Sequence, residues 1–109
     1  MITMVRRNEQ VAESIMHLAA DFLARESNRE SLITVTGSDM SPDYKNITIF
    51  LSVLPESAEE KALSFAKRVR TDFREYLKEK SKLHPIPTVD FEIDYGEKNR
   101  QRVDELTRN

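Results

Sequence analysis

The 109-residue sequence contains no cysteine, only two glycines and only two histidines. Without cysteine it forms neither disulfides nor thiolate metal sites, and the redox compartment is left open. Gly37 and Gly96 are too far apart for the glycine-rich loop that cradles phosphates, so nucleotide hydrolysis has no support. His17 and His84 are isolated, which argues against a metal site or a serine–histidine relay. We therefore expect no enzymatic activity, no catalytic residue, no metal and no cofactor.

Long hydrophobic runs are also missing. The longest apolar stretches are strand-length, well short of the roughly 20 residues that a membrane-spanning helix requires. Arg6 and Arg7 are not followed by the apolar segment of a secretory signal. The length suits one domain, residues 1–109, with a modest core. We expect a cytoplasmic, monomeric protein that does not associate with membranes.

The first helical pattern runs from Asn8 to Glu26. Asn8 is a suitable N-cap, because its side chain can accept a hydrogen bond from a free backbone N–H. Residues 1–7 are therefore predicted to form a flexible arm. The apolar residues recur three and four positions apart, which places them on one face of an amphipathic helix: Val11, Ile15, Leu18, Ala19, Phe22 and Leu23.

Two strands joined by a turn come next. Residues 32–40 alternate aliphatic residues with threonine, which favours a strand, and Gly37 indicates a bulge in it. Residues 41–46 carry proline, aspartate and asparagine, which are typical of turns. Residues 46–54 are almost entirely apolar, which predicts a buried central strand that ends before Pro55.

The longest periodic segment runs from Ser57 to Lys82. Ser57 is followed three residues later by Glu60, the pattern of a capping box. Residues 84–87 (HPIP) form an extended connector after the helix, because each proline restricts the residue before it. Apolar residues at helical spacing predict one long helix: Ala62, Phe65, Ala66, Val69, Phe73, Tyr76 and Leu77.

A third strand and a last helix complete the pattern. Residues 88–95 place Val, Phe, Ile and Tyr on one face and acids on the other, which predicts an edge strand with one wet face. Residues 97–107 are predicted to form a short helix, followed by a tail. The order α-β-β-α-β(-α) predicts an α+β domain. Its three-stranded mixed sheet has an antiparallel hairpin, a parallel pair joined by a right-handed crossover, and two long helices on one face.

The charges are unevenly distributed, although the formal net charge is only −2. Residues 61–84 hold eight Lys and Arg against three acids, and residues 26–60 hold two against seven acids. At about 100° per residue, one flank of the long helix carries basic residues without an acid: Lys67, Arg70, Arg74 and Lys78. Such a one-sided row suits contact with the phosphates of folded RNA, whereas a merely solvated face is the commoner role of a charged helix. Further candidates for RNA contact are Lys80, Lys82, Arg6 and Arg7, with His84 beside them.

The predicted element order is that of the type II KH architecture of RNA-binding domains. Within it, the sequence resembles the ribosome-binding factor A family, small bacterial assembly factors of the small ribosomal subunit. The resemblance spans roughly residues 6–106. Four segments carry it: VAESI at 11–15, ITVTG at 33–37, SPDYKNITI at 41–49 and PTVDFEID at 87–94.

The resemblance implies a function and raises a question about the long helix. It implies binding to the immature small ribosomal subunit and its ribosomal RNA, during late maturation of that RNA and at low temperature. KH domains that clamp single strands use a Gly-x-x-Gly loop, and this family has an Ala-x-Gly kink in its place. Here neither motif is present: residues 66–68 or 70–72 would occupy the kink region without glycine, so the sequence does not indicate a kink.

A competing hypothesis is a protein-interaction module. It would dock a basic partner through the acidic side of the hairpin, formed by Glu26, Glu30, Asp39, Asp43 and Glu56. The row of acids at positions 90, 92 and 94 favours an exposed sheet face over a cation site. The tyrosines at 44 and 95 are expected to pack against the domain rather than to stack on bases.

Overall fold

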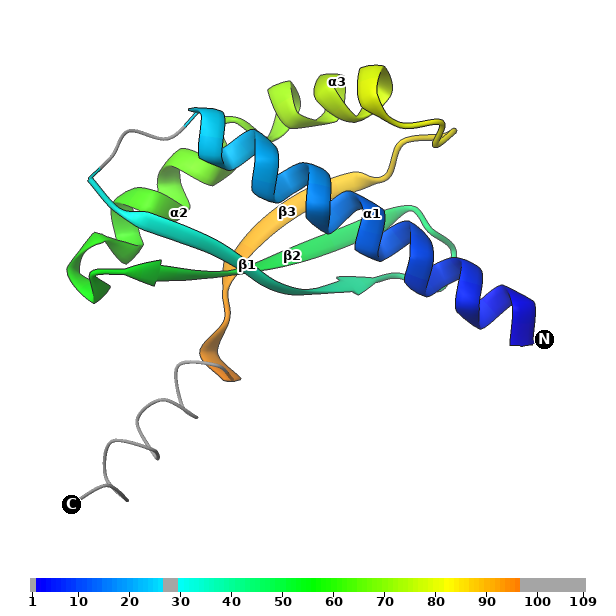
Figure 1. The fold of residues 1–109 in the computed structure, drawn as a ribbon, viewed down its shortest axis with the longest axis horizontal. Helices are drawn as coiled ribbons and strands as arrows, with labels where there is room; N and C mark the ends of the chain where they lie inside the picture. Colours follow the sequence, from blue (N-terminus) through cyan, green and yellow to red (C-terminus); the bar gives the residue numbers. More distant parts are fainter. Residues whose placement is uncertain (1, 27–29, 97–109) are drawn as a thin grey trace.

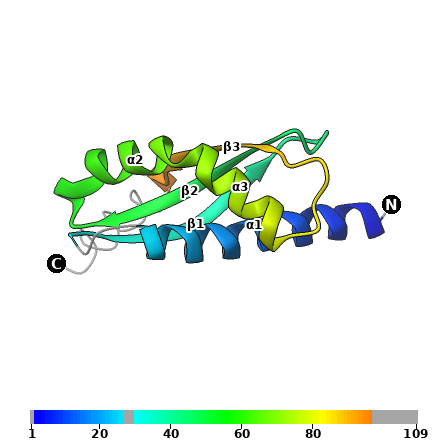
Figure 2. The ribbon, with the colours of Figure 1, turned by 90° about the horizontal axis from the view of Figure 1, so that it is seen from above.

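The computed structural model describes residues 2–26 and 30–96, with side chains from residue 10 onward (Figure 1). The predicted α+β class and the mixed sheet are confirmed. Figures 1 and 2 show the helices on one face of the sheet. The predicted helix over residues 97–107 lies outside the described residues. The elements are α1 (Ile2–Glu26), β1 (Leu32–Met40), β2 (Asn46–Leu54), the 3-10 turn η1 (Glu56–Ala58), α2 (Glu59–Arg68), α3 (Arg70–Lys80) and β3 (Thr88–Ile93).

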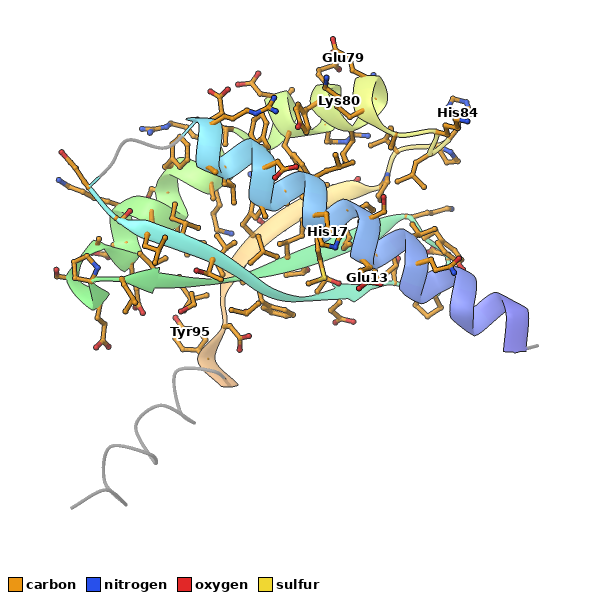
Figure 3. The ribbon with its side chains drawn as sticks, viewed as in Figure 1. Glu13, His17, Glu79, Lys80, His84 and Tyr95 are labelled. Carbon is orange, nitrogen blue, oxygen red and sulfur yellow. The ribbon has the colours of Figure 1, made fainter. Side chains whose placement is uncertain are left out.

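The sheet has the predicted topology, with β2 between its two neighbours. β1 pairs antiparallel with β2, and the register shifts between Val35 and Gly37, which confirms the predicted bulge. β2 pairs in parallel with β3, so that Ile49 lies opposite Phe91. β3 ends at Ile93, and the alternation predicted to continue to Tyr95 is wrong: Tyr95 is 63% exposed and lies away from the helices (Figure 3).

The core fills the layer between the helices and the sheet. Phe73 of α3 is fully buried, and its ring lies 5.3 Å from that of Phe22 and 5.9 Å from that of Phe91. Fully burying such a side chain stabilises the fold by about 1.5–3 kcal/mol. β2 contributes every second residue, as expected for a strand with one face on the core. The largest fully buried side chains are Phe73, Phe91, Ile15, Leu23, Ile47, Ile49, Leu51 and Leu77.

The first helix is longer than predicted. α1 begins at Ile2, so the predicted start at Asn8 is wrong, and residues 2–7 belong to a helix rather than to an arm. No glycine or proline interrupts this stretch. An asparagine within a helix costs less than about 0.7 kcal/mol relative to alanine, so a residue suited to an N-cap need not end the helix.

The second predicted helix is broken in two. α2 ends at Arg68 and α3 begins at Arg70, with Val69 between them, so the single predicted helix is two helices, and the kink that the sequence did not indicate is present. Val69 has φ −95° and ψ 11°, a conformation between helix and strand that any residue can adopt, and the break therefore needs no glycine. The predicted capping box is also wrong. Ser57 lies in η1, and α2 has no side-chain cap, because the helix continues directly from that turn.

Candidate nucleic-acid interface

The predicted basic row lies along the break between α2 and α3. Lys67 stands one residue before the end of α2, and Arg70 begins α3. Arg74 and Lys78 follow at one-turn intervals on α3. Arg6 and Arg7 lie in α1, outside the part of the chain whose side chains are described. The structure therefore brings one continuous set together on α2 and α3, and each member has a different environment.

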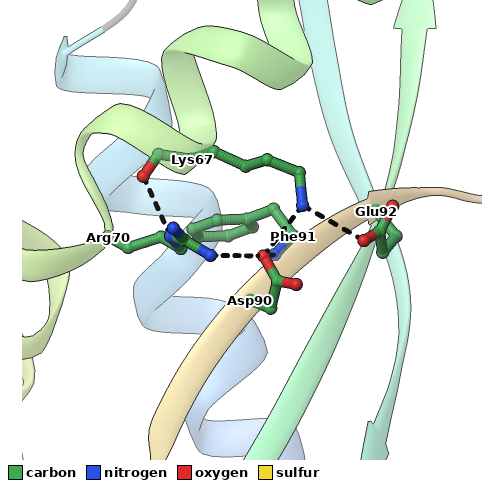
Figure 4. A network of polar contacts seen from close by, with 5 residues as sticks. All are labelled: Lys67, Arg70, Asp90, Phe91 and Glu92. Carbon is green, nitrogen blue, oxygen red and sulfur yellow. Dashed lines mark hydrogen bonds and ion pairs between the residues drawn. The ribbon is translucent and has the colours of Figure 1, made fainter.

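The first two members of the row are held by acids of β3 (Figure 4). Lys67 Nζ lies 3.1 Å from Asp90 Oδ1 and 3.1 Å from Glu92 Oε1. Arg70 Nη1 lies 2.9 Å from the same Asp90 oxygen. That oxygen also accepts a hydrogen bond from the backbone N–H of Phe91 at 2.9 Å. We call the four charged side chains (Lys67, Arg70, Asp90 and Glu92) the edge network, because they join the helix break to the edge strand.

The edge network shifts two pKa values. Partial burial raises the pKa of the Asp90 carboxyl, but the hydrogen bonds from Lys67, Phe91 and Arg70 outweigh burial and hold that pKa below its ordinary value. Burial lowers the pKa of Lys67, but its hydrogen bonds to Asp90 and Glu92 and their charges outweigh burial and raise it. The Lys67 ammonium and the Asp90 carboxylate are therefore both charged at neutral pH. Asp90 and Glu92 of β3 form ion pairs with the helix break, in addition to making the edge strand polar.

Arg70 has a second role at the helix break. Its Nε donates a hydrogen bond of 2.9 Å to the backbone oxygen of Lys67. The last carbonyls of a helix lack partners within the helix, and here a side chain supplies one for α2. The guanidinium thus joins the end of α2 to Asp90 of β3, which stabilises the break between the two helices.

Arg74 forms hydrogen bonds with the backbone of the connector between α3 and β3. Its Nε donates to the backbone oxygen of Pro87 at 3.2 Å, and its Nη2 donates to that of Ile86 at 3.3 Å. These bonds hold the proline-containing connector against α3. Two nitrogens of the Arg74 guanidinium therefore already donate hydrogen bonds within the protein, and its remaining N–H groups can still contact a phosphate.

The cations at the end of α3 are the most available. Lys78 forms an exposed ion pair of 3.2 Å with Glu75, one turn away on the same helix. Such pairs contribute little, typically below about 1 kcal/mol. Lys80 and Lys82 are exposed and take part in no ion pair within residues 10–26 and 30–96. Figure 3 shows Lys80 and Glu79 at the outer end of α3, pointing away from the sheet.

The acids of the competing hypothesis do not form one surface. Asp39 and Asp43 lie at the turn of the hairpin, while Glu30 and Glu56 flank its other end. At about 3.3 Å per residue, the nine-residue strands separate these ends by roughly 25 Å. The Asp43 carboxylate accepts hydrogen bonds from Ser41 Oγ at 2.7 Å and from the Lys45 N–H at 3.1 Å, which lower its pKa. The Asp43 carboxylate therefore stabilises the hairpin turn.

Other features of the described residues add no second site. A cleft of about 660 Å³ lies between the end of α1 and α2, and its lining contains both acids and bases besides apolar side chains. Within residues 10–26 and 30–96, His, Asp and Glu side chains form no group of three that could hold a metal ion. Among the described helices, none is both long and apolar enough to span a bilayer.

The edge network could have been anticipated only in part from the sequence. The alternation of acids over residues 88–95 was visible, and so was the basic row. Lys67 and Asp90 are 23 residues apart, and helical spacing says nothing about such a pair. The missing information was that the parallel crossover places the helix break beside the edge strand.

Comparisons with known proteins agree with the fold. A family model described as ribosome-binding factor A matches residues 7–107. A ribosome-binding factor A from Anaeromyxobacter sp. (strain Fw109-5) is 32% identical over 106 residues, which cover 94% of this chain and 87% of the relative. The crystal structure of ribosome-binding factor A from Thermus thermophilus matches with a TM-score of 0.70 and 17% identity, over 78% of this chain and 92% of that chain.

A third match concerns a complex. A homology model of the Thermus thermophilus factor, fitted into a cryo-EM map of its complex with 30S, has a TM-score of 0.68 and 18% identity to this chain. The match covers 76% of this chain and 90% of that one. At these identities the two structural matches show the shared fold.

Proposed function

The chain belongs to the ribosome-binding factor A family, and we propose that it binds the immature small ribosomal subunit and aids late maturation of its ribosomal RNA. The match across residues 7–107 carries this proposal. The complex of the Thermus thermophilus relative with 30S supports the choice of partner. The proposed role is binding rather than catalysis, in the cytoplasm and with a part in growth at low temperature.

The RNA-binding surface is proposed to lie at the end of α3 and the start of the connector. Lys78, Lys80 and Lys82 supply point charges there, and Arg74 holds the neighbouring backbone in place. Phosphate contacts of this kind position a protein on RNA without reading its bases. Arg6 and Arg7 of α1 are proposed as additional contacts.

We propose recognition of a structured RNA surface by shape and charge. A single-strand clamp requires close backbone approach at a glycine loop, and the break at Val69 is formed without glycine. In this proposal the break at Val69 changes the direction of the chain, so that α3 and the lysines near its end do not continue along the axis of α2 (Figure 1).

The test is co-sedimentation of the purified protein with small ribosomal subunits across a salt series. The variant Lys80→Glu/Lys82→Glu is compared with Lys45→Glu/Lys61→Glu, which changes the charge equally at exposed positions of the hairpin turn and α2. Loss of two phosphate contacts should lower the slope of log K against log salt by about 1.4–1.8. The control variant should retain the slope of the wild-type protein.

Two results would contradict the proposal. If the wild-type protein fails to co-sediment with small subunits even at low salt, the family role does not extend to this chain. If the control variant loses binding as completely as Lys80→Glu/Lys82→Glu, the end of α3 is not the contact surface, and only net charge matters.

A further inference from the structure

In the edge network, two of the predicted RNA-binding cations, Lys67 and Arg70, already form ion pairs with carboxylates of the protein itself. Asp90 Oδ1 accepts from Lys67 Nζ at 3.1 Å and from Arg70 Nη1 at 2.9 Å, and Glu92 accepts from Lys67 at 3.1 Å. An ammonium and a guanidinium that converge on one oxygen are the arrangement by which proteins bind a phosphate oxygen. The carboxylates thus occupy the place that a phosphate of RNA would take.

The network is nevertheless accessible to a large ligand. Lys67 and Arg70 have 34% and 43% of their side chains exposed, and Asp90 and Glu92 have 38% and 44%. A phosphate that displaced the carboxylates would leave two negative charges beside the RNA. Repulsion from these charges opposes the exchange, so the two cations are close to the proposed RNA surface but do not add to its affinity.

We propose that Asp90 and Glu92 limit the affinity for ribosomal RNA by acting as internal phosphate mimics that withhold Lys67 and Arg70. This inference rests on the proposed function. In this inference the acids of β3 regulate the strength of RNA binding. Lys67 and Arg70 at the helix break are paired with these acids and do not bind RNA, whereas the lysines near the end of α3 remain free to bind it.

The experiment neutralises the two acids with near-isosteric amides. In Asp90→Asn/Glu92→Gln, Lys67 and Arg70 lose their anionic partners, keep only neutral amide acceptors, and can contact two additional phosphates. The slope of log K against log salt should then steepen by about 1.4–1.8, and binding to small subunits at about 0.1 M salt should tighten on the order of tenfold or more. Adding Lys67→Met and Arg70→Met to this variant should return the slope to that of the wild-type protein.

A matched control separates this effect from a change in net charge. Glu13 of α1 and Asp72 of α3 are exposed acids that form no ion pair within the described side chains. Glu13→Gln/Asp72→Asn raises the net charge by the same amount without releasing a cation. We expect this control to bind slightly tighter with an unchanged slope. Urea unfolding of each variant verifies that it is folded under the binding conditions.

Each outcome is decisive. A steeper slope for Asp90→Asn/Glu92→Gln alone supports the inference. An equal slope for the wild-type protein and this variant overturns it, as does a lower slope for Lys67→Met/Arg70→Met made in the wild-type background, because the two cations would then already contact RNA. Absence of binding by the wild-type protein removes the proposed function, and the inference with it.

Discussion

Replacing Arg70 by methionine tests whether its guanidinium holds the break between α2 and α3. The substitution keeps an unbranched side chain but removes the hydrogen bond to the Lys67 carbonyl and the ion pair with Asp90. A hydrogen bond from a charged group contributes about 1.5–3 kcal/mol when shielded, which we reduce to about 1 kcal/mol because the side chain is 43% exposed. The exposed ion pair adds about 0.2–1 kcal/mol. The free energy of unfolding should therefore fall by about 1.2–2 kcal/mol.

The matched control is Lys67→Met, which removes ion pairs to Asp90 and Glu92 but no cap of the helix. Because both pairs share one partly exposed ammonium, we expect their loss together to cost only about 1 kcal/mol. Arg70→Lys should cost less than Arg70→Met, since an ammonium can reach the carboxylate or the carbonyl but lacks the planar fork that joins both. Urea unfolding followed by circular dichroism measures the three values. If Arg70→Met costs no more than Lys67→Met, the cap does not stabilise the break and the reasoning fails.

Two further predictions concern the core and the response to pH. Phe73→Ala should lower the free energy of unfolding by about 3–5 kcal/mol in the same urea assay, because it leaves a cavity beneath Phe22 and Phe91; a loss below about 1 kcal/mol would contradict the packing. Since the pKa of Asp90 is lowered in the folded state, its contribution is complete above the ordinary value of about 4 and is lost as the pH falls through the folded value. The stability difference between wild type and Asp90→Asn should therefore shrink between about pH 5 and pH 2, and a constant difference would refute this assignment.

The strands were predictable because local patterns specify them. β1 and β2 have the predicted bounds, and the bulge lies at Gly37 as expected. Strict alternation leaves little freedom in register once one face must be buried. The order of the three strands then followed from loop length and the handedness of the crossover.

The helix ends were less predictable, because end signals in sequence are weak preferences. Asn8 can cap a helix but also fits inside one, and α1 passes through it. Ser57 matches a capping box, yet η1 before α2 makes the cap unnecessary. The break at Val69 uses a backbone conformation open to any residue, and its stabilising contacts come from Arg70 and the distant β3.

The charge pattern of α2 and α3 shows why a helical projection alone cannot identify a binding surface. A helical projection compares a residue only with its neighbours on the same helix, and there Lys67 and Arg70 face no acid. In the folded chain the parallel crossover brings the acids of β3 to the same corner, so these cations are paired while Lys80 and Lys82 are exposed without an ion pair among the described side chains. A cation that is already satisfied gains little from a phosphate, because it must first give up a carboxylate. In the proposed function, the basic row therefore contains cations of unequal value for RNA binding, and the acids that decide between them belong to another element of the fold.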